Sequence, residues 1–328
     1  IYEGPIEGDL FLKYPCTNGQ KPIISKEGNI YVICQDEKYS LYSITHQGDF
    51  NWNFDIDGYT KDYYPALGSD ESIYVMSQAR YDGGILHKIN SDGELDWKVS
   101  GLESNGIPAA VTFHNNKIYT GYTSFLENGA NEWGINSSTS GVVSISKSDE
   151  LYVTFKNGNM RKLSLSGEQL YFQSTEGYSS FAAIDKDENI YTTIWTRYGN
   201  KIISYNKEGK VRWQHTGDEN NMLSFNDVSI DSNGTIYSAA NNGNLYAFNS
   251  DKSEKWRMNF SSGRNSSPVI DNKGNIFYLS GHYLHKISSE GKIIWSIPAE
   301  YHAEGNGLAI GADKSIYFQC GNFICGVR

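Results

Sequence analysis

The chain has 328 residues, of which 38% are hydrophobic and 20% are charged, a composition typical of folded globular proteins rather than disordered ones. Its net charge of −10 argues against nucleic acid and anionic membranes as partners, because both select a basic surface. No apolar run approaches the ~20 residues that cross a bilayer, so we expect no membrane insertion. The chain begins at Ile1 rather than Met, and we expect a secreted protein whose signal peptide has been removed.

The first predicted strand lies near the N-terminus, in "DLFLKYPC" around Phe11. This segment aligns with "FNWNFD", so Phe11 takes the place of Trp52. An Ile- or Leu-aromatic pair after a polar turn then recurs eight times, about every 41 residues. The aromatic members of these pairs are Tyr31, Tyr74, Tyr119, Tyr152, Tyr191, Tyr237, Phe277 and Tyr317. A second aromatic follows each of the first seven pairs: Trp52, Trp97, Trp133, Tyr171, Trp213, Trp256 and Trp295.

Each period is predicted to hold four short strands. In the seventh copy they are 267–271, 275–280, 283–288 and 292–297, separated by clusters of Gly, Asn, Asp and Ser that favour hairpins. The third copy is short between Tyr119 and Trp133, so its third strand is expected to be stunted or absent. The eighth copy ends at Arg328, before its fourth strand.

Four strands in a period of this length are typical of a β-propeller blade. We therefore expect an all-β protein, an eight-bladed propeller of four-stranded antiparallel blades. Residues 1–328 would form one domain, in which 1–16 supply the outer strand of blade 8 and close the ring. A propeller must close because open sheet edges favour aggregation. The alternatives are an open β-solenoid and a seven-bladed ring with an insertion.

The ends of the periods read "LHKINSDGELDW", "LYAFNSDKSEKW" and "LHKISSEGKIIW". These segments resemble the PQQ-like repeat of the quinoprotein alcohol dehydrogenase-like propellers, across nearly the whole chain. The resemblance implies an eight-bladed ring in which the recurring Trp packs between blades. The family includes pyrroloquinoline quinone enzymes and an outer-membrane assembly lipoprotein that acts as a scaffold. The quinone enzymes carry a vicinal Cys-Cys pair and large insertions that this chain lacks, so we expect no cofactor.

One face of such a propeller carries the loops between blades and the turns between second and third strands. Functional residues gather on loops that a rigid scaffold holds in place. The aromatic and polar side chains predicted on this face suit a polar ligand with an apolar surface, such as a peptide or a glycan. The candidate ligand-binding residues are Tyr63, Tyr64, Arg80, Tyr81, Trp195, Arg197, Tyr198, Arg264, His282, Tyr301 and His302.

Catalytic and metal-binding patterns are weak in this sequence. His302 and Glu304 form a His-x-Glu pair in a loop, which is a weak pattern for general acid–base catalysis. His87 and His285 occupy equivalent repeat positions, which indicates packing. The turn 185–189 resembles a calcium loop but lacks its Gly and final Glu. We assign no catalytic residue and no metal site.

The four cysteines are predicted to lie together where the ring closes. We favour Cys16–Cys325 with Cys34–Cys320, and next Cys16–Cys34 with Cys320–Cys325. Free thiols and metal ligation are the alternatives. Disulfides would place the protein in an oxidising compartment, either extracellular or periplasmic.

The sequence therefore favours a non-catalytic binding or scaffolding propeller that recognises a protein, peptide or glycan partner. An enzyme acting on a glycan-like substrate at the mouth of the axial channel is the alternative, and a quinone-dependent dehydrogenase is less favoured. We expect a monomer.

Overall fold

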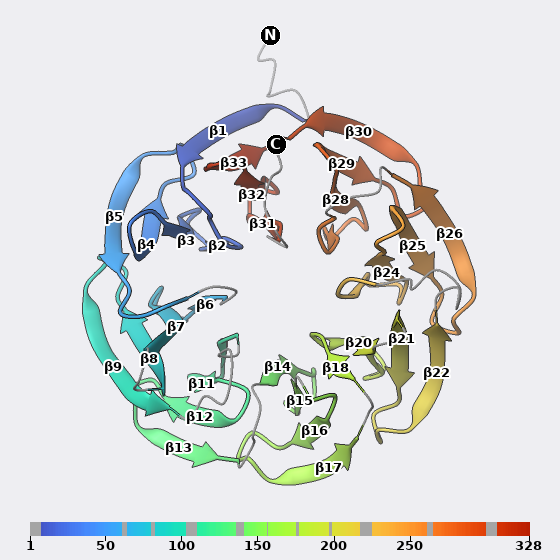
Figure 1. Cartoon of the computed structure of the whole chain (residues 1–328), viewed down its shortest axis with the longest axis horizontal. Helices are drawn as coiled ribbons and strands as arrows, with labels where there is room; N and C mark the ends of the chain where they lie inside the picture. The colour runs from blue at the N-terminus through green and yellow to red at the C-terminus, as the bar shows by residue number, and fades with distance from the viewer. Residues whose placement is uncertain are drawn as a thin grey trace.

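Each repeat found in the sequence folds into one antiparallel sheet, and the sheets surround a central axis in a computed structural model (Figure 1). The structure describes residues 8–60, 64–79, 83–102, 110–135, 141–155, 157–174, 177–196, 199–216, 225–260, 265–299 and 307–328. These residues form eight sheets, so the eight-bladed propeller is confirmed, and the seven-bladed ring and the open solenoid are wrong. Across the same ranges, no helix has the length and apolarity that a membrane crossing requires.

The strands of a blade are named A to D from the axis outward. Strand A is β2 (Ile23–Ile24), β6 (Ala66–Leu67), β10 (Thr112–His114), β14 (Gly141–Ile145), β19 (Ala183–Ile184), β23 (Ser229–Ile230), β27 (Val269–Ile270) and β31 (Ala309–Ile310) in blades 1 to 8. Strand B is β3 (Ile30–Gln35), β7 (Ile73–Ala79), β11 (Lys117–Tyr119), β15 (Leu151–Phe155), β20 (Ile190–Thr196), β24 (Ile236–Ala239), β28 (Ile276–Ser280) and β32 (Ile316–Cys320).

Strand C is β4 (Tyr39–Ile44), β8 (Gly83–Ile89), β12 (Thr123–Leu126), β16 (Met160–Leu163), β21 (Gly199–Tyr205), β25 (Asn244–Phe248), β29 (Tyr283–Ile287) and β33 (Phe323–Val327). Strand D is β5 (Phe50–Asp55), β9 (Leu95–Leu102), β13 (Asn131–Gly134), β17 (Gln169–Gln173), β22 (Val211–Thr216), β26 (Glu254–Asn259), β30 (Ile293–Pro298) and, for blade 8, β1 (Leu10–Pro15). Blade 5 has an extra short strand, β18 (Tyr178–Ser179). The third strand of blade 3 is present as β12, although it has only four residues.

The polar turns fix the hairpins between strands A and B. In blade 7, the Asp271 carboxylate accepts hydrogen bonds from the backbone N–H groups of Lys273 and Asn275, each at 2.8 Å. Gly274 follows with φ 80°, a conformation that favours glycine. Short side chains that bond to nearby backbone stabilise such turns, which is why the pattern recurs around the ring.

The ring closes where β1 pairs antiparallel with β33, and Figure 1 shows these strands beside each other near the two chain ends. The bulge between Leu10 and Leu12 matches the bulge between Phe50 and Trp52 in blade 1, so the expected alignment of Phe11 with Trp52 is wrong by one residue. Leu12, rather than Phe11, lies where six blades have Trp and blade 4 has Tyr171. It packs against Gly48 of the next blade, where an added Cβ would lie 3.7 Å from the Leu12 side chain. Phe11 lies at the bulge and contacts Tyr317 edge-on, with ring centroids 6.1 Å apart.

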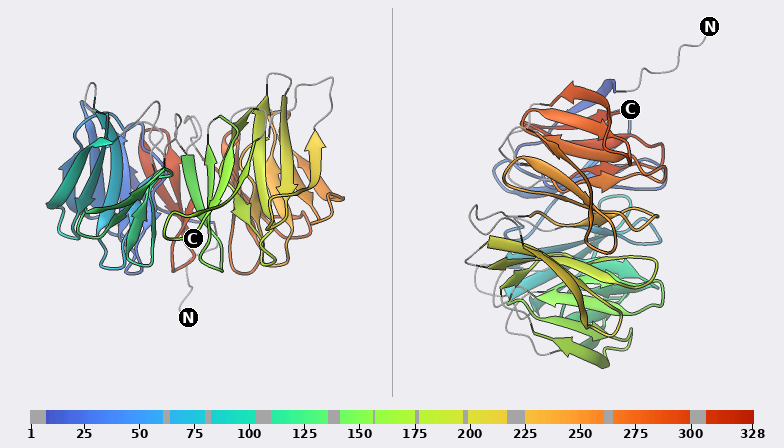
Figure 2. Two further views of the ribbon diagram at one scale, coloured as in Figure 1. Left: turned by 90° about the horizontal axis from the view of Figure 1, so that it is seen from below. Right: turned by 90° about the vertical axis from the view of Figure 1, so that its right-hand side faces the viewer.

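The recurring tryptophans join each blade to the next, as the repeat predicts. The Trp52 indole donates a hydrogen bond to the Ser91 carbonyl at 2.8 Å, and its ring covers Gly93 in the turn between strands C and D of blade 2. The same contact recurs from Trp97 to Glu127, Trp133 to Leu165, Trp213 to Ser250 and Trp256 to Ser289, at 2.9 to 3.0 Å. The blades thus form a thick disc (Figure 2), a rigid support for the loops on its two faces.

Candidate functional site

The loop face of the disc carries the B-to-C turns and the segments that cross from one blade to the next. Before blade 5, the crossing segment pairs with the end of strand B, so that Tyr178 lies opposite Trp195. Gly177 has φ 117°, and a Cβ there would lie 2.2 Å from the Trp195 carbonyl oxygen. Only glycine permits this close backbone approach, so the pair is held by the strands themselves.

Tyr178 and Trp195 are strongly exposed despite this fixed backbone. Their side chains are 65% and 50% exposed, although they are cross-strand partners. Tyr59 and Tyr283 on the same face are also about half exposed, at 47% and 50%. Large aromatics that remain exposed on rigid strands are typical of binding surfaces, because little conformational entropy is lost when a partner covers them.

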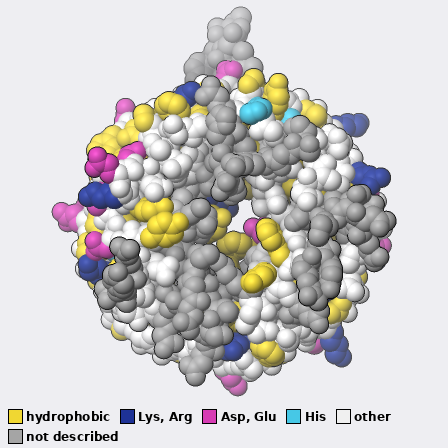
Figure 3. All heavy atoms as spheres, in the orientation of Figure 1, with side chains coloured by type: hydrophobic (Ala, Val, Ile, Leu, Met, Phe, Trp, Pro, Cys, Tyr) yellow, Lys and Arg dark blue, Asp and Glu magenta, His cyan; other side chains and the backbone are white. Residues whose placement is uncertain are grey.

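The axial channel opens at the centre of this face, where Figure 3 shows a hollow with hydrophobic side chains at its edge. In each blade the strand-B aromatic pairs with a residue of strand A, and the residue two positions before that strand-A partner lies at the channel. In blades 1 to 8 these residues are Lys21, Tyr64, Ala110, Val142, Phe181, Asp227, Ser267 and Gly307. Tyr64 of blade 2 and Phe181 of blade 5 meet with ring centroids 5.7 Å apart. An aromatic pair from distant blades therefore narrows the channel.

Two opposite charges lie in the same ring of positions. The Lys21 stem runs over Gly307, where an added Cβ would lie 2.8 Å from its Cδ. Desolvation lowers the pKa of Lys21, although the nearby Asp227 carboxylate acts in the opposite direction. Desolvation also raises the pKa of Asp227, against the effects of a hydrogen bond from Ser180 and the charge of Lys21. Two side chains of opposite charge therefore lie at this level of the channel, and each influences the pKa of the other.

The predicted binding residues fall at separate places. Tyr64 lines the channel, Trp195 lies on the rim of blade 5, and His282 is exposed in a pocket between blades 7 and 8. The other predicted residues lie outside the described ranges: Tyr63, Arg80, Tyr81, Arg197, Tyr198, Arg264, Tyr301 and His302. Sequence reasoning missed Lys21, Phe181, Asp227 and Tyr178. A comparison of the residues preceding each strand A would have found the first three, since these positions vary while the residue after each of them is apolar.

All four cysteines form disulfides, but the favoured pairing is wrong. The bonds are Cys16–Cys34, with Cα atoms 5.2 Å apart, and Cys320–Cys325, with Cα atoms 5.9 Å apart. The chain after β1 leaves blade 8 and runs beside the end of β3, where the Gln35 N–H donates to the Thr17 carbonyl at 2.8 Å. Cys16 therefore meets Cys34 of blade 1 instead of Cys325 in its own blade.

Groupings that would suit a metal ion are not found within the described ranges, where no three His, Cys, Asp or Glu side chains come together. The Asp185 carboxylate of the calcium-like turn accepts hydrogen bonds from the N–H groups of Asp187 and Asn189, at 2.9 and 2.8 Å. This is the ordinary A-to-B turn of the repeat. His87 and His285 are buried in strand C, as the packing interpretation predicts.

A family model described as outer membrane protein assembly factor BamB matches residues 82–297 and 199–323. The chain belongs to the BamB family. BamB from Moraxella catarrhalis superposes with a TM-score of 0.72 over 98% of this chain and 100% of that one, at 12% identity. A streptogramin B lyase has a TM-score of 0.60 over 81% and 92% of the two chains, also at 12% identity. At such identities the likeness shows the fold alone.

Two curated relatives of the chain are lambda-carrageenases from Pseudoalteromonas sp and Pseudoalteromonas carrageenovora. Each is 26% identical over 141 residues, which make up 41% of this chain and 15% of the carrageenase. The chain thus spans only a small part of the length of these curated relatives.

Proposed function

We propose that the chain is a non-catalytic scaffold that binds a protein or peptide partner on its loop face. The observation that carries this proposal is the exposed pair of Tyr178 and Trp195, held by two paired strands. Tyr and Trp are the residues most often found at the energetic centres of protein interfaces. Membership of the BamB family supports the same conclusion, because the name of that family describes an assembly factor.

The two disulfides favour an oxidising location, so we place the scaffold in the periplasm or outside the cell. Neither bond joins adjacent cysteines, and the described residues hold no grouped metal ligands, so nothing in them favours quinone-dependent chemistry. The part of the scaffold that would contact the partner comprises the crossing segments before blades 2 and 5, with Tyr59 and Tyr178, together with Trp195. We expect the protein to act as a monomer, because the closed ring already pairs every blade with two neighbours.

A glycan partner is the second candidate, favoured by the partial match to the lambda-carrageenases. Aromatic rings such as Trp195 also stack on sugars, so the same surface serves either partner class.

A combined peptide and glycan array separates these candidates. We expect the purified protein to bind peptides, and Trp195→Ala to weaken binding at least ten-fold, as for a residue at the centre of an interface. Phe50→Ala is the matched control, since Phe50 is 52% exposed but lies at the start of an outer strand. Binding that is unaffected by Trp195→Ala, or equally weakened by Phe50→Ala, would exclude this surface. Glycan binding alone would select the second candidate.

A further inference from the structure

Two pairs of side chains cross the axial channel beside each other. Tyr64 of blade 2 meets Phe181 of blade 5, and Lys21 of blade 1 interacts electrostatically with Asp227 of blade 6. Blade 1 adjoins blade 2, and blade 5 adjoins blade 6 (Figure 1). The Asp227 carboxylate also accepts a hydrogen bond from Ser180, the residue before Phe181. A charged pair therefore lies next to an aromatic pair at one level of the channel.

The two charges of this pair do not touch each other. Lys21 and Asp227 interact through space, whereas the Lys98 ammonium group binds the Asp57 carboxylate directly at 2.7 Å. Among the residues that the structure describes, neither Lys21 nor Asp227 has an opposite charge within the distance of about 4 Å that defines an ion pair. Both side chains are half-buried, so each keeps some contact with solvent. Separated opposite charges that are partly buried cost folding free energy, and such charges are typical of ligand sites.

Small residues leave room in front of the two charges. Between blades 6 and 1, the channel positions are Ser267 of blade 7 and Gly307 of blade 8. The Lys21 stem lies over Gly307, where an added Cβ would be 2.8 Å from its Cδ, so this side chain turns from blade 1 towards blade 8. The space beside the charged pair is thus bounded by small residues on one side and by the aromatic pair on the other.

We propose that this part of the channel binds a free α-amino acid in its zwitterionic form. The carboxylate of the ligand pairs with Lys21, its ammonium group pairs with Asp227, and an apolar side chain lies against the rings of Tyr64 and Phe181. Charge-assisted hydrogen bonds of about 2.8 Å at each end of such a molecule bridge a gap that a direct ion pair does not close. A zwitterion also pairs both buried charges without bringing a net charge into the channel.

Calorimetric titration of the purified full chain at pH 7 tests this proposal with three probes: L-leucine, N-acetyl-L-leucine and L-leucinamide. The acetyl compound lacks the ammonium group, and the amide lacks the carboxylate. We expect L-leucine to bind, and each derivative to bind at least ten-fold more weakly, because one charge in the channel then stays unpaired. This comparison uses the wild-type protein alone, so it does not depend on the folding of any variant.

Two variants assign the ends of the ligand. Lys21→Met is expected to bind L-leucine at least ten-fold more weakly than the wild type does, and to bind L-leucine and L-leucinamide with similar affinity. Asp227→Asn is expected to lose the distinction between L-leucine and N-acetyl-L-leucine in the same way. Lys26→Met is the matched control, because Lys26 is exposed on the A-to-B turn of blade 1, and it is expected to bind as the wild type does.

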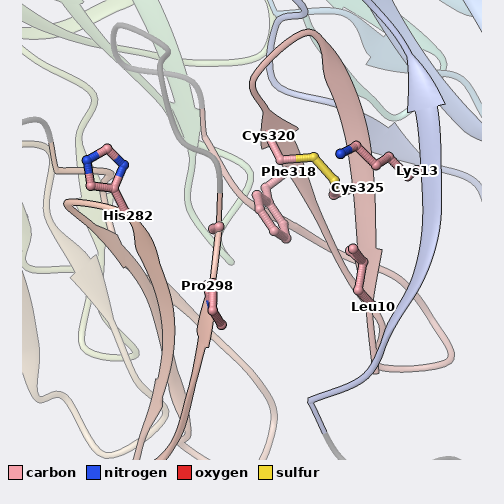
Figure 4. Close-up of a pocket in the computed structure, with 8 residues that line it drawn as sticks. Leu10, Lys13, His282, Pro298, Phe318, Cys320 and Cys325 are labelled. Carbon is pink, nitrogen blue, oxygen red and sulfur yellow. A yellow bond between two sulfur atoms is a disulfide. The ribbon is translucent and has the colours of Figure 1, made fainter.

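A second hollow, of about 330 Å³, lies between blades 7 and 8 and has a size that suits the same probes (Figure 4). Its apolar lining includes Leu10, Pro298, Ala299 and Phe318. Ala299 and Phe260 hold equivalent positions, since the backbone N–H of each donates to a carbonyl in the B-to-C turn of its own blade. Ala299→Phe therefore narrows this hollow, and we expect it to leave the binding of L-leucine unchanged.

Three results would overturn the proposal: equal affinity for L-leucine and its two derivatives, wild-type binding by Lys21→Met, or no binding of L-leucine at millimolar concentration. Loss of binding in Ala299→Phe would also overturn it, by placing the ligand between blades 7 and 8. The site does not depend on the partner proposed for Tyr178 and Trp195. Trp195→Ala is accordingly expected to bind L-leucine as the wild type does, so that the failure of one proposal leaves the other standing.

Discussion

His285 provides a sharp test of how tightly the blades pack. Its imidazole is 8% exposed, lies against the Phe260 ring, and has its Nδ1 2.7 Å from the Ser296 hydroxyl. Desolvation lowers the pKa of His285 from 6.5 to about 4. Because the folded protein binds this proton more weakly than the unfolded chain does, folding loses stability as the pH falls below 6.5 and reaches the full loss near pH 4.

The size of the effect follows from the shift. One pKa unit corresponds to about 1.4 kcal/mol, so between pH 6.5 and pH 5 this histidine costs about 2 kcal/mol of unfolding free energy. His285→Tyr removes the titrating group and introduces the residue that blade 6 has at the same position, Tyr246. We expect the variant to lose about 2 kcal/mol less than the wild type does between pH 7 and pH 5.

Urea unfolding followed by tryptophan fluorescence at pH 7, 6 and 5 measures this difference. His282→Gln, which removes an exposed imidazole from the same blade, is measured alongside as the control. Parallel pH profiles for the wild type and His285→Tyr would show that the imidazole is hydrated in the folded protein, and would refute the packing described for this junction.

Three further results are expected from denaturant unfolding. Gly93→Ala should be less stable than Gly234→Ala by about 1–3 kcal/mol. Both residues have φ above 80°, but an added Cβ would lie 2.5 Å from a tryptophan ring at Gly93, whereas at Gly234 it would have no neighbour within 4 Å. Equal losses of stability would contradict the close packing of the tryptophan. Replacing Cys16 and Cys34 together with Ser should cost about 3 kcal/mol, because their disulfide closes a short loop of the unfolded chain; an unchanged midpoint under oxidising conditions would contradict this. Asp227→Asn should gain stability relative to the wild type as the pH rises from 3 to 7, because the raised pKa of Asp227 makes its ionisation costly in the folded state. A difference in unfolding free energy between the two proteins that stays constant with pH would show that the carboxyl is well hydrated.

The architecture was predictable because it repeats. A polar turn, a buried aromatic and a docking aromatic recur in most blades, so that a single irregular copy does not hide the period. The register at closure was not predictable to one residue. Leu12 takes the tryptophan position because β1 has the same bulge as the other outer strands, and the sequence pattern had put the neighbouring aromatic residue, Phe11, in that place.

The disulfides show a related limit. The sequence places four cysteines where the ring closes, but it does not show which neighbour each one meets. Cys16 pairs with Cys34 because the chain has already left blade 8 and turned along β3, a path set by backbone hydrogen bonds rather than by side-chain pattern.

The candidate site was predictable in kind but not in place. Tyr64 and Trp195 were expected on one surface, yet Tyr64 packs against Phe181 at the channel while Trp195 remains exposed beside Tyr178. The direction of each side chain depends on where the crossing segment meets the end of strand B, and for Tyr178 that depends on Gly177. Such contacts between distant residues are set by the closed ring.

The central claim is that the loop face contacts a protein through Tyr178. Its most direct measurement replaces Tyr178 with a photo-crosslinking phenylalanine derivative in cells that produce the protein, with the same replacement at Phe50 as the control. We predict a discrete protein adduct from position 178 and none from position 50. No adduct from position 178, or the same adducts from both positions, would contradict the account.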